Sequence, residues 1–140
     1  MSVAPTVTDF EIATDPKSLL LRVFRPEGTG PFPVVINLHG GAWTKGDLNE
    51  CRPRDEAIAR AGVASAALNF RHGADGYPTS LLDINYAVRW VKTNAERLDV
   101  DPERVGLAGQ SSGGHLAMLA AMRPSERRYT ALPLPTEHNA

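Results

Sequence analysis

The sequence predicts an α/β fold, with a mostly parallel sheet, an antiparallel hairpin at its N-terminus and flanking helices. Two patterns lead to this prediction. Apolar, partly β-branched runs alternate with segments whose apolar residues recur every three or four positions, which is typical of strands joined by crossover helices. Two strand-like runs joined by a short turn precede this alternation, as in a hairpin. The 140 residues suffice for one compact domain.

Three strands are predicted in the first part of the chain. Residues 8–12 alternate polar and apolar side chains, which indicates a half-exposed strand. The turn Asp15-Pro16-Lys17-Ser18 separates this run from a second strand at residues 19–24. Residues 34–38 are nearly all apolar and partly β-branched, which favours a strand covered on both faces in a parallel sheet.

Helices and strands alternate in the middle of the chain. Residues 54–61 favour a helix closed by Gly62, and residues 63–70 form the next apolar strand. Ser80 and Asp83 have the spacing of a capping box at the start of the following helix. That helix has an apolar stripe with spacings of three and four, formed by Leu81, Ile84, Val88, Val91, Ala95 and Leu98.

The last predicted elements are a short buried strand at residues 105–108 and a small-residue, apolar helix at residues 112–122. We expect ordered structure over about residues 7–122, and a loop or tail over residues 123–140, where the pattern dissolves. Residues 1–140 then form a single partial domain. Its sheet stops at the last strand, which leaves an apolar strand at an open edge.

Composition and charge exclude several classes of function. Hydrophobic residues make up 42% of the chain and charged residues 22%, as in ordinary globular proteins. A net charge of -1 gives no general attraction to nucleic acid. No apolar run is long enough to cross a membrane, and the start of the chain lacks a secretory pattern. The histidines and the single cysteine show no metal-ligand spacing, so neither a metal nor a cofactor is expected, and a cytoplasmic location is predicted.

The motif Gly109-Gln110-Ser111-Ser112-Gly113 contains a candidate nucleophile. A nucleophile elbow is a sharp turn from strand to helix, and residues two positions either side of its serine must be small. Ser111 meets this condition, whereas Ser112 has Gln110 two positions before it. A predicted strand ends just before the motif and a predicted helix begins within it. Ser111 is therefore the predicted nucleophile, with a structural turn as the alternative.

A second motif, His39-Gly40-Gly41-Ala42-Trp43, follows the third predicted strand. Acyl transfer develops negative charge on a carbonyl oxygen, which backbone N–H groups stabilise when they point at it. Glycine lets the backbone approach a substrate closely. We predict an oxyanion hole formed by the amides of Gly40, Gly41 and Ser112, with Ala42 as a substitute donor. The alternative is a glycine-rich turn after a core strand.

Together, the two motifs resemble the carboxylesterase and lipase branch of the α/β-hydrolases. The His-Gly-Gly-x-Trp form followed by Gly46-Asp47 is most similar to small bacterial esterases of the feruloyl- and acetyl-esterase type, and kynurenine formamidases are similar there. Residues 83–90 and 101–105 also resemble this branch. The resemblance covers about residues 33–122. It implies the N-terminal half of an α/β-hydrolase that cleaves small carboxylic esters through an acyl-serine intermediate, with Trp43 either in the substrate pocket or in the core.

The chain departs from this family after the nucleophile, where the resemblance implies a triad acid and histidine on later loops. The only downstream acids are Glu126 and Glu137, and the only downstream histidines are His115 and His138. His115 lies one turn into a helix, where a packing role is expected, and His138 lies two residues from the end. We therefore expect a second polypeptide with the C-terminal half to supply acid and base. A truncated product is the alternative, and the isolated chain should be inactive.

Two upstream histidines are assigned structural roles. His39 is expected to hold the oxyanion loop by hydrogen bonds, and His72 to be polar loop surface. Two other functions remain open: an amide or formamide hydrolase with the same machinery, and a non-catalytic binding module that lost its triad.

Overall fold

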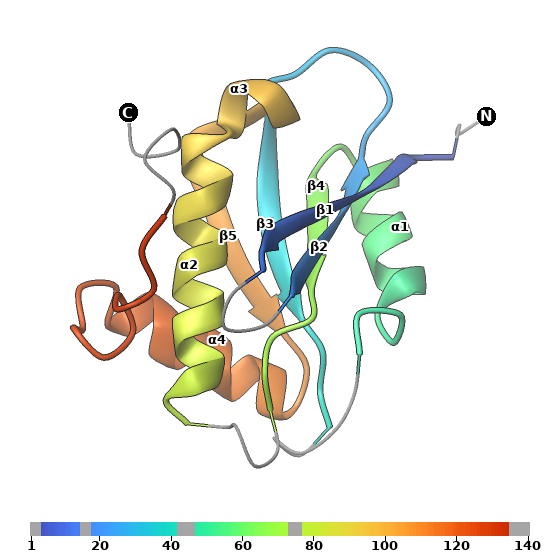
Figure 1. Ribbon diagram of the computed structural model, residues 1–140. Coiled ribbons are helices and arrows are strands. Elements are labelled where there is room, and N and C mark those ends of the chain that lie inside the picture. The colour runs from blue at the N-terminus through green and yellow to red at the C-terminus, as the bar shows by residue number, and fades with distance from the viewer. Residues whose placement is uncertain (1–3, 15–17, 42–46, 73–76, 135–140) are drawn as a thin grey trace.

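The computed structural model describes residues 4–14, 18–41, 47–72 and 77–134. Within these residues one sheet separates α1 from α2 and α4 (Figure 1). The elements in chain order are β1 (Thr6–Ala13), β2 (Leu19–Arg25), β3 (Phe32–Leu38), α1 (Arg52–Arg60), β4 (Ala64–Leu68), α2 (Thr79–Thr93), α3 (Ala95–Leu98), β5 (Val100–Gly109) and α4 (Ser112–Met122).

The sheet has the strand order β1-β2-β4-β3-β5. β3 pairs in parallel with both β4 and β5, and α1 and α2 lie in the connections between these strands. β1 and β2 form the predicted antiparallel hairpin, and β2 pairs antiparallel with β4. The predicted α/β fold class is therefore confirmed, and the hairpin makes the sheet as a whole mixed.

β5 lies at the edge of the sheet, and among the described residues β3 is its only partner strand. This strand begins earlier than predicted, because Val100 already pairs with Phe32, and the register shifts before Val105 pairs with Val34. Residues 105–108 are half-buried or exposed rather than fully buried. The open apolar edge expected from the sequence is thus present, and it accounts for the incomplete burial.

The core lies between the sheet and α2, and the predicted apolar stripe faces it. The stripe was predicted on a single helix, which is wrong, because α2 ends at Thr93 and Ala95 and Leu98 lie on the separate helix α3. Leu81, Ile84 and Val91 are fully buried, whereas Val88 is only half-buried. Tyr86 is buried on the same helix, and its hydroxyl donates to the carbonyl oxygen of Ile12 at 2.5 Å. The hairpin is thereby tied to the helix that covers this face.

The predicted capping box at the start of α2 is wrong. The N-cap is Pro78, Ser80 is buried inside the first turn, and no side chain caps the helix. The Asp83 carboxylate instead accepts hydrogen bonds from the backbone N–H of Arg71 at 2.8 Å and from its guanidinium Nη2 at 2.8 Å. A buried carboxylate gains more from a charged partner than from capping a helix. The pair also fixes the segment that follows β4.

Replacing Asp83 with alanine is expected to lower the free energy of unfolding by about 3 kcal/mol, because it leaves the Arg71 guanidinium without its buried partner. The side chains of Asp83 and Arg71 are only 1% and 13% exposed. Urea unfolding followed by circular dichroism would measure the loss. Asp101→Ala is the matched control, since it removes the exposed pair with Arg104 and should change stability little. Equal effects of the two variants would contradict the assignment.

Residues 123–134 contain no helix or strand, yet they pack against α2. Tyr129 and Leu132 are buried, and Arg89 donates from Nη2 to the Leu132 carbonyl at 2.6 Å. Asn85 donates to the carbonyl of Pro124 at 3.2 Å. The expected loop or tail is thus a packed loop as far as residue 134, while residues 135–140 lie outside the described part.

Candidate active site

Ser111 occupies the sharp turn between β5 and α4. Its φ is 56° and its ψ is −122°, and it is the N-cap of α4. A non-glycine residue with such a φ carries about 1–3 kcal/mol of strain, which persists only where the surroundings fix it. The side chain is exposed. The sequence therefore folds here into a strained strand-turn-helix that presents a serine hydroxyl to solvent.

Two glycines allow this turn to form. A Cβ atom added to Gly109 would lie 2.3 Å from the backbone of Gly113, and one added to Gly113 would lie 2.3 Å from the carbonyl oxygen of Leu38. These distances are too short for any side chain, and backbone atoms cannot move aside cheaply. The small residues required by the elbow motif are thus required by contacts among β5, α4 and the end of β3.

Backbone hydrogen bonds hold the elbow from both sides. The N–H of Gln110 donates to the Leu38 carbonyl at 3.3 Å, and the N–H of Gly113 donates to the Gln110 carbonyl at 2.9 Å. The N–H of His115 donates to the carbonyl of Ser111 at 3.2 Å. The peptide groups before and after Ser111 are therefore both fixed.

The predicted oxyanion loop lies beside the serine. A Cβ atom on Gly40 would lie 3.4 Å from the Cβ of Ser111 and 2.9 Å from the Gln110 carbonyl oxygen. Gly41 has a φ of 132°, which favours glycine. Ser112 begins α4, where backbone N–H groups lack acceptors within the helix. The structure thus places the Gly40 backbone beside Ser111, and Ser112 follows Ser111 directly at the start of α4.

Two predicted site residues, Ala42 and Trp43, lie outside the described residues. His39 is 3% exposed, and its Nδ1 lies 2.7 Å from the Gly40 carbonyl oxygen. Because a carbonyl oxygen only accepts, this nitrogen carries the hydrogen. The His39 ring stacks on Phe70 at 4.4 Å between centroids and meets the edge of His72 at 5.6 Å. His39 thus holds the loop as expected, whereas His72 is half-buried against it rather than simple loop surface.

The candidate acids and histidines downstream of Ser111 lie on α4, in the loop after α4, or outside the described residues. The side chain of His115 is exposed on α4, in contrast to the packing role expected for it. Glu126 accepts from Arg128 at 2.6 Å, and this hydrogen bond lowers the pKa of its carboxyl. Glu137 and His138 lie outside the described part. No triad acid or base is identified among residues 4–14, 18–41, 47–72 and 77–134.

The esterase-like geometry has a counterpart among known proteins. Residues 21–137 match the family model described as BD-FAE. The chain belongs to this family of α/β-hydrolase carboxylesterases.

Several relatives of this BD-FAE chain are esterases. It is 35% identical over 103 residues to the probable carboxylic ester hydrolase LipM of Mycobacterium tuberculosis, covering 72% of the chain and 24% of LipM. It is 31% identical over 133 residues to the ethyl acetate hydrolase of Pseudomonas putida, covering 91% of the chain and 42% of that enzyme. The chain therefore spans less than half the length of these relatives.

Solved structures show the same likeness. The carboxylesterase EstE1, cloned from a metagenomic library, superposes with a TM-score of 0.78 at 26% identity, covering 87% of this chain and 44% of EstE1. The esterase LipW of Mycobacterium marinum superposes with the same TM-score at 30% identity, covering 85% of this chain and 38% of LipW. The described residues therefore have the fold of part of an esterase domain.

Sequence reasoning missed a polar cluster beneath the elbow of this BD-FAE chain. Asp55 of α1 is fully buried, and its Oδ1 accepts from Ser65 Oγ at 2.6 Å and from Asn37 Nδ2 at 2.8 Å. Burial raises the pKa of the Asp55 carboxyl, while these two hydrogen bonds oppose the rise. Polar residues within otherwise apolar strands were the signal, since Asn37 and Ser65 interrupt β3 and β4.

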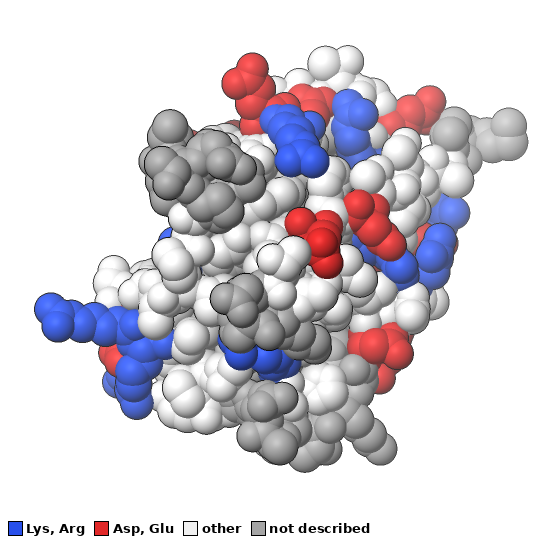
Figure 2. All heavy atoms as spheres, viewed as in Figure 1, with Lys and Arg blue, Asp and Glu red and all other residues white. Residues whose placement is uncertain are grey.

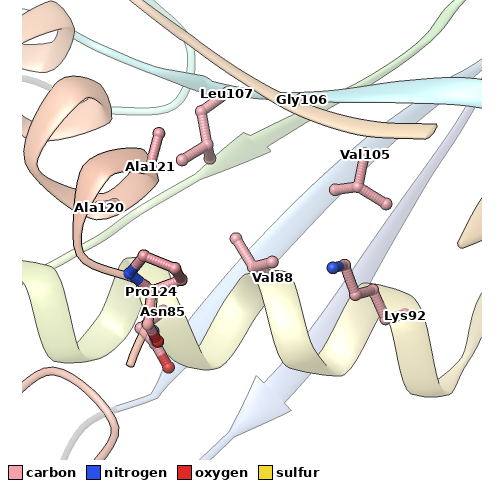
Figure 3. Close-up of a pocket in the computed structure, with 9 residues that line it drawn as sticks. All are labelled: Asn85, Val88, Lys92, Val105, Gly106, Leu107, Ala120, Ala121 and Pro124. Carbon is pink, nitrogen blue, oxygen red and sulfur yellow. The ribbon is translucent and has the colours of Figure 1, made fainter. Parts of the chain in front are cut away.

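A cavity of about 270 Å³ lies at the open edge of the sheet, away from the nucleophile (Figure 3). Its walls come from α2, β5 and the C-terminal end of α4 with Pro124, and neither Ser111 nor Gly40 lines it.

Charged side chains of both signs are interspersed over the face seen in Figure 2. Among the described residues, no helix is long and apolar enough to span a membrane and no cluster suits a metal ion.

Proposed function

We propose that this chain supplies the nucleophile and the oxyanion hole of a serine hydrolase that cleaves small carboxylic esters. The observation that carries the proposal is the strained Ser111, held at a φ of 56° with the Gly40 backbone beside it. Strain of this kind collects at sites where geometry serves a reaction. The esterase family and the esterase relatives support an ester as the substrate.

In the proposed reaction, the Ser111 hydroxyl oxygen attacks the carbonyl carbon of the ester and passes its proton to a histidine base. The amides of Gly40, Gly41 and Ser112, with Ala42 as a substitute, hold the negative oxygen of the tetrahedral intermediate. The base returns the proton to the departing alcohol, which leaves an acyl-serine. Water then attacks this acyl group by the same steps and releases the carboxylic acid.

We assign the acid and the histidine to polypeptide that completes the sheet at β5, carried by a second chain or by a longer form of this one. Three features support a covered surface there: the edge of β5, which is unpaired among the described residues, the cavity and two exposed methionines. Met118 and Met122 of α4 are 63% and 73% exposed, and large apolar side chains grouped on a surface often mark contacts. A cytoplasmic location remains a prediction from the single cysteine.

The test is covalent labelling with a fluorophosphonate, which reacts with activated serines. The chain is affinity-purified with any polypeptide that accompanies it, treated with the probe, and analysed by peptide mass spectrometry. Label is expected on Ser111 and should vanish in Ser111→Ala. Ser112→Ala is the matched control, because it keeps the backbone amide that the proposal uses, so labelling should persist. Labelling that survives Ser111→Ala would overturn the assignment.

A further inference from the structure

Arg54 of α1 connects the elbow to the end of β3. Its Nη1 donates to Oε1 of Gln110, the residue before the nucleophile, at 3.4 Å. Its Nη2 donates to Oδ1 of Asn37 at 2.8 Å. One half-buried guanidinium thus contacts two segments that are far apart in sequence, at the turn where Ser111 is presented.

The residues that Arg54 contacts on the β3 side lie in the protein interior. Asn37 and Asp55 are 1% and 0% exposed, and the Asn37 amide nitrogen donates to the Asp55 carboxylate. A carboxylate only accepts, so the Asn37 carbonyl oxygen must face the guanidinium. Hydrogen-bond donation therefore runs in one direction, from Arg54 through Asn37 to Asp55. The negative charge of Asp55 and the positive charge of Arg54 also favour each other across Asn37.

The outer end of the connection is exposed. The backbone of Gln110 is bound to Leu38 and Gly113, but its side chain lies on the surface. An exposed glutamine otherwise samples several rotamers. A bond from a fixed guanidinium restricts these rotations.

We infer that Arg54 is a positioning residue for the nucleophile, acting through the Gln110 side chain on the backbone before Ser111. The catalytic part of this inference, that Arg54 positions a nucleophile, rests on the proposed function. The geometric part stands separately, because the rigidity of the elbow can be measured without any reaction. A purely structural Arg54 would instead serve only to balance the charge of the buried Asp55.

Amide hydrogen exchange by NMR on the full chain separates these roles. Arg54→Met should speed exchange at the amides of Gly113 and His115 by about tenfold relative to amides in β1 and β2, the factor that one charge-assisted hydrogen bond provides. The matched control is Arg60→Met on the same helix, whose exposed pair with Glu56 lies at 3.9 Å. It should leave the elbow amides unchanged.

Gln110→Ala keeps the inference testable if Arg54→Met does not fold, because it leaves the charge next to Asp55 intact. It should speed exchange at Gly113 and His115 by a similar factor, and adding Arg54→Met should give little more. Additive effects of the two changes, or faster exchange spread evenly over the whole chain, would overturn the inference.

Fluorophosphonate labelling of the same variants tests the link to catalysis. If the variants with faster exchange at the elbow are also labelled more slowly at Ser111, the rigidity of the elbow serves the nucleophile. Faster exchange at the elbow with an unchanged rate of labelling would leave the proposed function intact but show that Arg54 has no role in catalysis.

Discussion

Residues 1–140 produced alone are expected to show no Ser111-dependent hydrolysis of a short-chain aryl ester. A serine hydroxyl is a weak nucleophile without an adjacent base. Loss of the histidine from a serine-hydrolase triad lowers kcat by about 10⁶. The described residues hold the proposed nucleophile and the beginning of the proposed oxyanion loop, and no histidine among them is assigned as the base. The assay compares the chain with Ser111→Ala, and the two rates should coincide.

Activity should return when the missing part of the domain is supplied. The experiment co-expresses the chain with C-terminal halves of related esterases, each with its acid and histidine, and assays the same ester. Restored turnover should depend on Ser111 and on the added histidine. The same partner should also reduce association of the chain through the open β5 edge, which gel filtration would measure. A monomeric chain whose Ser111-dependent turnover is lost in His138→Ala would contradict this expectation and make the chain complete.

Patterns that are local in sequence predicted most of the architecture. Alternation and spacing located every strand and the helices α1, α2 and α4, because the periods of 2 and 3.6 residues follow from backbone geometry. The helix after the nucleophile was predicted with its observed bounds of 112–122. The test for glycine two positions from Ser111 also worked locally, since it describes contacts made by the turn itself.

Contacts between distant segments were not predictable in the same way. Asp83 could cap its own helix or pair with a cation, and only the fold brings Arg71 to it. The polar cluster under the elbow joins residues 10 to 56 positions apart. Tyr129 lies in a segment without periodicity, yet it is buried, and its hydroxyl lies 3.1 Å from that of Tyr77. Sequence patterns indicate which face is apolar, but not which distant segment covers it.

The same difference between local motifs and distant contacts applies to the candidate site. The proposed nucleophile and oxyanion glycines were predicted from short motifs, because the chemistry needs particular residues at fixed spacing. Arg54 carries no such motif, and its hydrogen bond to Gln110 depends on how α1 packs against β4 and β2. A triad acid and base would also come from distant segments.

Replacing Gly113 with alanine is expected to abolish the stable fold of the chain. The added Cβ would lie 2.3 Å from the Leu38 carbonyl oxygen and 2.6 Å from that of His39. Both neighbours are backbone atoms at the end of β3, so relief requires the helix α4 to move away from the sheet. Overpacking of a rigid site costs about 1–3 kcal/mol and occasionally more. We expect at least about 3 kcal/mol here, a large part of the 5–15 kcal/mol that stabilises an ordinary domain.

Gly114→Ala is the matched control for this prediction. A Cβ atom on Gly114 would lie 3.2 Å from the Gly109 carbonyl oxygen, a contact that a small shift relieves. Alanine is also favoured over glycine within a helix by about 1 kcal/mol, which offsets the crowding. Urea unfolding should therefore show Gly114→Ala close to the parent chain and Gly113→Ala largely unfolded without denaturant. If both variants unfold at the same urea concentration, the close packing of the elbow against β3 is not what holds α4 in place.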